Sequence, residues 1–303
     1  MGKALPKVVL VTGATGFLGS HLCRALVERG HTVEAFRRRS SDLGRLGALA
    51  GQVRWHCAPD ELEAPFSGPI IPDALIHCAA LYGRRGESPV QLLEANTLLP
   101  VRLHHLAAQC GVPLFLNTDT ILDPALDLYA LSKHHAAQWL MRAGGPTRVL
   151  NLKLQHFYGP GDDPAKFITR LVTQCLANVP EIRLTDGRQQ RDFIYISDVV
   201  SAMLALLEGN PPADAAGGGF ANYDIGSGNP VPVRDLVELI HQLTGSRSRL
   251  AFGALAYRQG EPMLTRADTS ALRALGWQPR VQLPEGLERT IAAEGVKPKR
   301  VCE

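Results

Sequence analysis

The stretch VVLVTGATGFLGSHLCRAL, residues 8–26, decides the fold. Its aliphatic first part predicts a buried β-strand, and the apolar spacing of its second part predicts an amphipathic helix. In the turn between them, Gly13 permits a tight bend, Gly16 lets a pyrophosphate approach the backbone, and Gly19 lets the helix pack on the strand. The amides at the helix N-terminus would hold the phosphates. We therefore predict a dinucleotide site, with further contacts from Thr15, Phe17 and Leu18.

The rest of the first half continues this alternation of strands and helices. Short apolar runs, each long enough for one strand, occur at residues 7–12, 32–36, 74–78, 113–118 and 148–154. Longer helical patterns lie between them, at residues 17–29 and 92–110. This order predicts an α/β fold with a doubly wound parallel sheet covered by helices.

The rhythm loosens after about residue 155 into loops rich in glycine and proline. One of them, GNPPADAAGGG at residues 209–219, is expected to be a surface connection. Helical patterns return at residues 233–243 and 283–294. We expect a dinucleotide-binding domain and a smaller α+β substrate lobe, divided as residues 1–155 with a return segment at about 191–222, and mainly residues 156–303.

Composition excludes several classes of protein. The chain has 303 residues, 45% of them hydrophobic and 20% charged, and a net charge of only +3, which is too small for a protein that coats nucleic acid. Six scattered cysteines without a CxxC pair indicate reduced thiols. The histidine pairs 104–105 and 134–135 are adjacent and cannot share a helix face, so we expect no metal site. Without a spanning apolar segment or a signal pattern, we expect a soluble cytoplasmic protein with no membrane partner.

Three arginines follow the second apolar run, in VEAFRRRSS at residues 33–41. In the predicted fold this strand ends beside the adenosine ribose, where an acidic residue would bind both hydroxyls of NAD. Arg37 occupies that end, and its guanidinium can hold a 2′-phosphate that an acid would repel. Glu34 competes for this role because it lies nearer the usual spacing from the glycines, but it sits inside the strand. We therefore expect NADP(H), bound by Arg37 with help from Arg38, and a solvated Arg39.

A second reactive set lies in NTDTILDPALDLYALSK, residues 117–133. Thr118 closes the fifth expected strand, while Tyr129 and Lys133 stand four apart at the start of a helix and share one face. Tyr129 can give a proton to a carbonyl oxygen, and Lys133 with an oxidised nicotinamide would lower its pKa by stabilising the phenolate. We expect Thr118 to hydrogen-bond the same oxygen. A Tyr-x-x-x-Lys spacing alone proves little, so its place after this strand carries the prediction.

Together these motifs resemble the extended short-chain dehydrogenase/reductase family, in the branch that acts on nucleotide sugars. The motifs follow the family's order over nearly the whole chain: TGATGFLG, DALIHCAA, YALSK, FYGPGD, RQQRDFIYISDVV and YRQGEP. The resemblance implies that Thr118, Tyr129 and Lys133 are catalytic, and that Ala79 and Ala80 line the cofactor near its nicotinamide ribose. It also implies a homodimer.

In the carboxy-terminal lobe, the resemblance implies a site for a nucleotide diphosphate sugar. Arg191 and Arg258 would bind the phosphates and Glu261 the nucleotide ribose, because guanidinium groups pair with phosphates and a carboxylate accepts from hydroxyls. The alternative for each of these residues is a surface ion pair. His156 stands where many relatives have asparagine, as a substrate contact or as a buried structural histidine. The remaining predicted substrate contacts are Lys166 and Phe167.

Departures from the family pattern separate its reactions. The resemblance gives the 4,6-dehydratases an Asp and a Glu directly after the catalytic Thr, and the epimerase-reductases of the fucose type a Cys two places past it. Here Asp119 is followed by Thr120, which argues against both reactions. The segment LKLQHFYGPGDDPAKF is similar to that of 4-keto-6-deoxysugar reductases.

We therefore predict an NADPH-dependent reduction of the C4 ketone in a CDP-, dTDP- or GDP-linked 4-keto-6-deoxyhexose. Three alternatives stay open. They are a nucleotide-sugar 4-epimerase with tightly bound NAD, a reductase of small aromatic ketones, and a non-catalytic module that binds NADP. Trp139, on the helix after Lys133, belongs either to a dimer face or to the core.

Overall fold

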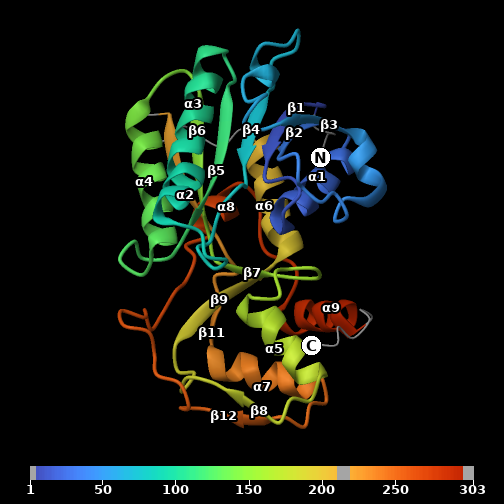
Figure 1. Ribbon diagram of the computed structural model, residues 1–303, viewed down its shortest axis with the longest axis vertical. Helices are drawn as coiled ribbons and strands as arrows, with labels where there is room; N and C mark the ends of the chain where they lie inside the picture. The colour runs from blue at the N-terminus through green and yellow to red at the C-terminus, as the bar shows by residue number, and fades with distance from the viewer. Residues whose placement is uncertain (1–4, 210–218, 296–303) are drawn as a thin grey trace. The chain divides into compact units, whose positions relative to one another are not determined.

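The computed structural model describes residues 5–209 and 219–295. They fall into two compact units, whose elements are labelled in Figure 1. The first unit contains Met1–Leu154, Val200–Ile225 and Ser270–Trp277, and the second contains Gln155–Val199, Gly226–Thr269 and Gln278–Glu303. The return segment was expected to begin at about residue 191. It begins at Val200, inside helix α6 (Ile196–Glu208), because strand β9 (Gln190–Tyr195) pairs with strands of the second unit.

The first unit is built on a parallel sheet in the order β10-β6-β5-β4-β1-β2-β3. Its strands are β1 (Val8–Thr12), β2 (Thr32–Arg37), β3 (Val53–Cys57), β4 (Ala74–His77), β5 (Leu114–Thr120), β6 (Arg148–Leu154) and β10 (Phe220–Ile225). The doubly wound order confirms the predicted fold class.

Two strands differ from the sequence-based expectation. β5 continues to Thr120, so Thr118 lies inside the strand and does not close it. β3 was not among the expected runs, because Arg54 and His56 interrupt its apolar residues. Both polar side chains contact Glu34 on the neighbouring strand, so pairing within the sheet stabilises a segment that hydrophobicity alone does not mark.

Helices cover the sheet. They are α1 (Phe17–Glu28), α2 (Pro89–Leu93), α3 (Leu99–Gln109), α4 (Leu128–Ala143), α6 and α8 (Ser270–Ala274), with short 3₁₀ segments η1 (Gly47–Gln52) and η2 (Ala64–Phe66). In Figure 1, α3 and α4 lie together on one side of the strands and α1 on the other. The single helix expected over residues 92–110 is interrupted by a π-helical turn, η3 (Glu94–Leu98), which joins α2 to α3.

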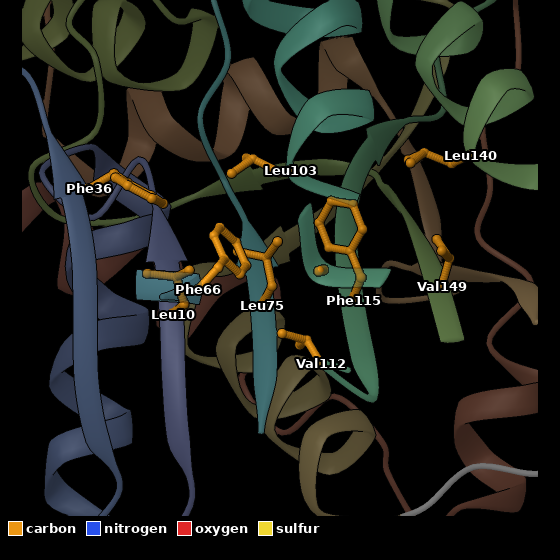
Figure 2. Packing of buried hydrophobic residues seen from close by; sticks show 10 residues of the cluster. Leu10, Phe36, Phe66, Leu75, Leu103, Val112, Phe115, Leu140 and Val149 are labelled. Atoms are coloured by element: carbon orange, nitrogen blue, oxygen red, sulfur yellow. The ribbon is translucent and has the colours of Figure 1, made fainter. Parts of the chain in front are cut away.

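The core of the first unit forms where α3 and α4 pack on the central strands. Figure 2 shows Leu103 of α3 and Leu140 of α4 beside Phe115 of β5. Phe115 is fully buried, with Leu75 and Val149 opposite it on the neighbouring strands, and Leu10 on β1 belongs to the same cluster. This packing fixes the carboxyl ends of β4 and β5, after which the reactive residues follow.

The second unit combines small sheets with three longer helices. Its strands pair as β11-β9-β7 and β12-β8. The elements are β7 (His156–Tyr158), β8 (Glu181–Arg183), β9, β11 (Pro230–Pro232), β12 (Arg249–Ala251), α5 (Phe167–Leu176), α7 (Val233–Leu243) and α9 (Leu283–Gly295). Asp192 in β9 is fully buried, and its carboxylate accepts from the backbone N–H groups of Ser227, Gly228 and Ala267 at 2.7, 2.9 and 3.0 Å. These bonds fix the loops around Arg191.

Several expectations concern the chain as a whole. None of the helices in residues 5–209 and 219–295 is long and apolar enough to span a membrane. The cysteines in these ranges are free thiols, and Cys302 lies outside them. Most of the glycine-rich connection, residues 210–218, also lies outside the described residues. Trp139 is 62% exposed on α4, so it is not a core residue of this chain.

Candidate functional site

The glycine turn after β1 has the geometry that its sequence predicts. Gly13 has a φ of +68°, and a Cβ there would lie 2.6 Å from the backbone nitrogen of Ala79, so any side chain would be both strained and blocked. A Cβ at Gly19 would overlap the carbonyl of Gly13, which explains how closely α1 approaches the turn. The N-cap of α1 is Gly16, which has no side chain to cover the first N–H groups. The turn therefore fits a dinucleotide phosphate.

The residues around this turn are tied to the end of β4. Thr12 Oγ1 lies 2.8 Å from His77 Nδ1 and accepts the N–H of Ala79 at 3.2 Å. Ala79 and Ala80 follow β4 directly and are half-buried, as a lining segment would be. Thr15 and Phe17 are also half-buried, whereas Leu18 is buried, so only its backbone is suited to meet a cofactor.

The end of β2 separates the two candidates for the ribose-binding role. Glu34 is buried inside the strand, and its carboxylate oxygens lie 2.7 Å from His56 Nε2 and 3.3 Å from Arg54 Nη1. Arg37 is the last residue of β2, and its side chain has no hydrogen bond or ion pair with any described residue. Arg38 is exposed in the following turn. Arg39 is ion-paired with Asp60 at 3.1 Å. The structure thus places Arg37 where an anion can reach it.

Tyr129 and Lys133 lie in the first turns of α4, whose N-cap fixes their position. The Asp127 side chain accepts the N–H of Ala130 at 2.8 Å, which starts the helix immediately before Tyr129. Lys133 is 1% exposed, and its Nζ has no hydrogen-bond partner in the part of the chain that the structure describes. Thr118 is buried, and its hydroxyl donates to the carbonyl of His77 at 2.8 Å. A hydroxyl has one hydrogen to donate, so Thr118 must release this bond before it can donate to a substrate oxygen.

In the protein by itself, burial is the largest influence on the pKa of Tyr129, and the lowering by Lys133 together with an oxidised nicotinamide stays a prediction. Burial raises the pKa of the phenol well above 10, and the nearby Tyr82 and Asp119 raise it further, while the Thr120 hydroxyl opposes them. Burial also lowers the pKa of Lys133, against the attraction of the Asp119 carboxylate. Desolvation disfavours both charges, so the phenol of the free protein is protonated at neutral pH.

Sequence reasoning missed two residues that shape this site, Tyr82 and Asn96. Tyr82, in the loop after β4, packs its ring 4.8 Å from that of Tyr129 at an angle of 33°. Asn96, in the π-helical turn, exchanges two hydrogen bonds with the backbone of Leu81, at 2.8 and 2.9 Å, and donates to Ser132 Oγ at 3.0 Å. Asn96 thus links the loop that carries Tyr82 to helix α4, which carries Tyr129 and Lys133. A polar residue within an apolar helical pattern was the available signal.

In the second unit, the predicted substrate residues form two ion pairs. Arg191 Nη2 lies 2.5 Å from Glu261 Oε1, and the Arg191 side chain is 7% exposed. Lys166 Nζ lies 3.0 Å from Asp162 and 4.2 Å from the centre of the Phe157 ring.

The other predicted substrate residues vary in exposure. His156 on β7 is half-buried, and its Nδ1 has no described partner. Burial, aided by Arg191, lowers the pKa of His156 to about 4, so it is neutral at pH 7. Phe167 begins α5, and Arg258 is exposed in the same turn as Glu261, whose N–H donates to its carbonyl at 3.1 Å.

Comparisons with known proteins find relatives over nearly the whole chain. The NAD dependent epimerase/dehydratase family matches residues 9–225. CDP-abequose synthase from Salmonella typhimurium is 32% identical over 301 residues, which cover 95% of this chain and 98% of that protein. A putative UDP-glucose 4-epimerase from Methanocaldococcus jannaschii is 26% identical, with 94% and 97% covered. The structure of MoeE5 in complex with UDP-glucose and NAD is 30% identical, with a TM-score of 0.78 and 94% and 98% of the two chains covered.

The doubly wound sheet, the glycine turn and the Tyr129–Lys133 helix define a nucleotide-sugar enzyme of the short-chain dehydrogenase/reductase type. The family match covers more than half of the chain. The chain therefore belongs to the NAD dependent epimerase/dehydratase family, and its relatives include a deoxysugar synthase, as the sequence motifs predicted.

Proposed function

We propose that this enzyme is an NADPH-dependent reductase of the C4 ketone in a nucleotide-linked 4-keto-6-deoxyhexose. The proposal rests on a dinucleotide turn, a Tyr-Lys helix and a deoxysugar synthase as a relative. Bound NADPH would supply a hydride to the ketone carbon. The chain's own residues must then hold the substrate and deliver one proton to the ketone oxygen.

The observation that carries the proposal is the placement of Tyr129 and Lys133 on one face of helix α4. A reductase needs a proton donor at the start of its reaction, and burial keeps this phenol protonated at neutral pH. When Tyr129 gives its proton to the oxygen, the phenolate that remains lies on the same helix face as the Lys133 ammonium. Because that ammonium is buried without a described partner, it is available to stabilise the new negative charge.

The neighbourhood of Thr118 supports reduction over elimination. The Asp119 carboxylate accepts the N–H of Thr120 at 2.7 Å and the side-chain amide of Asn151 at 2.8 Å. The Asp119 carboxylate is therefore engaged with other groups of the protein. Thr120 stands at the next position, where a dehydratase would have its second acid or base. A carbon acid such as the sugar C5 would lack a base at this place.

We further propose NADP(H) as the cofactor and a nucleoside diphosphate as the substrate's carrier. Arg37 supports the first choice, because Glu34 is committed to its neighbours on β3. Arg191 and Lys166 support the second, since both can pair with phosphate oxygens. The homodimer, the cytoplasmic location and the substrate roles of His156, Phe167, Arg258 and Glu261 remain predictions.

The direct test mixes pure protein with NADPH and a panel of CDP-, dTDP- and GDP-linked 4-keto-6-deoxyhexoses. Cofactor absorbance should fall with at least one member of the panel, and NMR should show a new hydroxyl-bearing C4. The nucleotide preference would then identify the carrier. If no sugar of the panel oxidises NADPH, the reductase proposal is wrong.

A nucleotide-sugar 4-epimerase is the second candidate, because MoeE5 binds NAD at 30% identity and a putative 4-epimerase is also similar. An epimerase keeps its cofactor through both half-reactions. It should therefore purify with NAD bound and interconvert 4-epimers without consuming free NADPH. Denaturing the purified protein and identifying the released nucleotide by mass spectrometry distinguishes the two candidates.

A further inference from the structure

The two faces of the β2–β3 ribbon differ in chemistry. β2 and β3 pair in parallel, with Ala35 opposite Trp55 and Arg37 opposite Cys57. Side chains two residues apart share a face, so Arg37 and Trp55 lie on the same face of the ribbon. The other face carries Glu34, which is bonded to His56 and Arg54. The Glu34 carboxylate therefore lies on the opposite face from the Arg37 side chain and does not pair with it.

Trp55 is the aromatic neighbour of the Arg37 guanidinium. The Arg37 Cζ lies 5.8 Å from the centre of the Trp55 ring, within the range of a cation–π contact. The ring is itself held, because Trp55 Nε1 donates to the carbonyl of Ala50 at 3.0 Å. Trp55 therefore offers Arg37 a fixed surface in place of an acidic partner.

The hydrogen-bonding capacity of Arg37 remains unused. Its Nε is buried and has no partner among the described residues, and its guanidinium forms no ion pair with them. Arg39, two residues further along, instead pairs with Asp60 and is mostly exposed. An arginine that is oriented by an aromatic ring and lacks a carboxylate keeps its planar set of donors for a ligand.

We propose that Trp55 is a positioning residue that sets the preference for a 2′-phosphorylated adenine nucleotide by holding the Arg37 guanidinium in place. This inference rests on the proposed use of NADP(H). A free arginine side chain loses much rotational freedom when it binds, and a neighbour that restricts it beforehand reduces that loss. Trp55 acts through Arg37 and does not itself contact the phosphate.

The test measures binding of two fragments that carry no nicotinamide, adenosine 2′,5′-bisphosphate and 5′-AMP, by calorimetry on the full chain. The unaltered protein should bind the bisphosphate more tightly. Trp55→Ala should reduce the ratio of the two affinities by about 3- to 30-fold, the size expected for losing a cation–π contact. Trp55→Phe, which keeps an aromatic face, should retain most of the preference. Arg37→Ala, which removes the proposed phosphate-binding group, should give the lowest ratio of the two affinities.

Two controls separate positioning from general damage. Arg39→Ala removes a charge from the same region without touching Trp55 and should leave the ratio unchanged. Trp55→Leu keeps apolar bulk at the site and replaces Trp55→Ala if that variant does not fold, as judged by thermal unfolding. A structural role for Trp55 alone would weaken both ligands equally.

The outcomes also separate this inference from the cofactor proposal. If the unaltered chain binds both fragments equally, the NADP(H) proposal and the role of Trp55 are both overturned. If the unaltered chain prefers the bisphosphate and the Trp55→Leu variant shows the same preference, only the role of Trp55 is overturned. A reduced ratio in Trp55→Leu that Trp55→Phe largely restores supports the inference.

Discussion

The two units present their positive charges in opposite ways. In the first unit, Lys133 Nζ and Arg37 Nε are buried and have no partner among the residues that the structure describes. In the second unit, Arg191 and Lys166 are paired with Glu261 and Asp162 of the same unit. The cations expected to serve the cofactor and the proton transfer are thus unpaired, whereas two of the three expected to serve the substrate, Arg191 and Lys166, are paired within the chain.

The difference affects how each group responds to an incoming anion. A desolvated cation without a partner is an unfavourable state, so an anion that reaches it gains the full interaction. A paired cation must first release its carboxylate, and the net gain is the difference between two ion pairs. Lys133 and Arg37 of the first unit can therefore accept an anion directly. Arg191 of the second unit must release Glu261 before it can pair with a phosphate.

Tyr129→Phe should have the largest effect, because it tests the claim that the first unit delivers the proton through Tyr129 beside the unpaired Lys133. The variant keeps the ring and its contact with Tyr82 but has no proton to give, so the turnover number should fall by about 10²-fold or more. Cofactor affinity, followed by fluorescence titration, should stay near that of the unaltered enzyme. Turnover within a few-fold of the original would show that another group delivers the proton.

Arg191→Ala tests the claim that a paired cation of the second unit binds the substrate phosphates. A charge-assisted pair with a phosphate is worth about 1.5–3 kcal/mol before the cost of releasing Glu261, so KM for the nucleotide sugar should rise by about 10-fold and by no more than about 100-fold. Glu261 would also lose its partner. Arg188→Ala is the matched control, because Arg188 is 79% exposed and paired with Asp186. An equal rise in KM for Arg191→Ala and Arg188→Ala would show that the loss of any positive charge in this unit weakens binding, and that Arg191 has no specific role.

The neutral His156 beside these cations makes stability depend on pH. Its pKa is lowered from 6.5 to about 4, so between these values the unfolded chain binds a proton that the folded chain does not. Stability should therefore fall as the pH decreases through this window. His156→Gln should remove a loss on the order of 1–2 kcal/mol between pH 7 and pH 5, measured by urea unfolding. Parallel losses in both proteins would contradict the shift.

The smallest expected effect tests the partner exchange itself. Glu261→Gln removes the competing carboxylate from Arg191, so inorganic pyrophosphate should bind about 3-fold more tightly, a gain of roughly 0.7 kcal/mol. The ribose-containing CDP should gain less, because Glu261 is also predicted to accept from ribose hydroxyls. Unchanged pyrophosphate affinity in calorimetry would show that the ion pair does not hinder binding.

Local patterns were enough to predict one part of this molecule. The strand–glycine–helix stretch at residues 8–26 specifies its own turn, because Gly13 and Gly19 are required by contacts a few residues away. The alternation of apolar runs and helical patterns predicted the parallel sheet, because each run or pattern is visible within its own segment. The place of Arg37 at the end of β2 also followed from the length of one apolar run.

The remaining features depend on partners far along the chain. β3 is held by pairing with β2 and by Glu34, which its own sequence does not show. The raised pKa of Tyr129 comes first from burial and then from Tyr82, a ring contact from a distant part of the chain. The pairing of Arg191 with Glu261 joins residues 70 positions apart. Spacing within one segment has no information about such contacts.

The π-helical turn at Glu94–Leu98 makes the register of this region sensitive to length. A π turn holds one residue more than the α-helical hydrogen-bonding pattern requires. Removing one residue there would restore a regular helix and change the direction in which the remaining residues of the turn point, while α2 and α3 could keep their places on the sheet. Asn96 would then turn away from Leu81 or from Ser132. A single-residue deletion in this segment would thus disconnect the Tyr82 loop from α4 while leaving every side chain of the proposed catalytic set in the sequence.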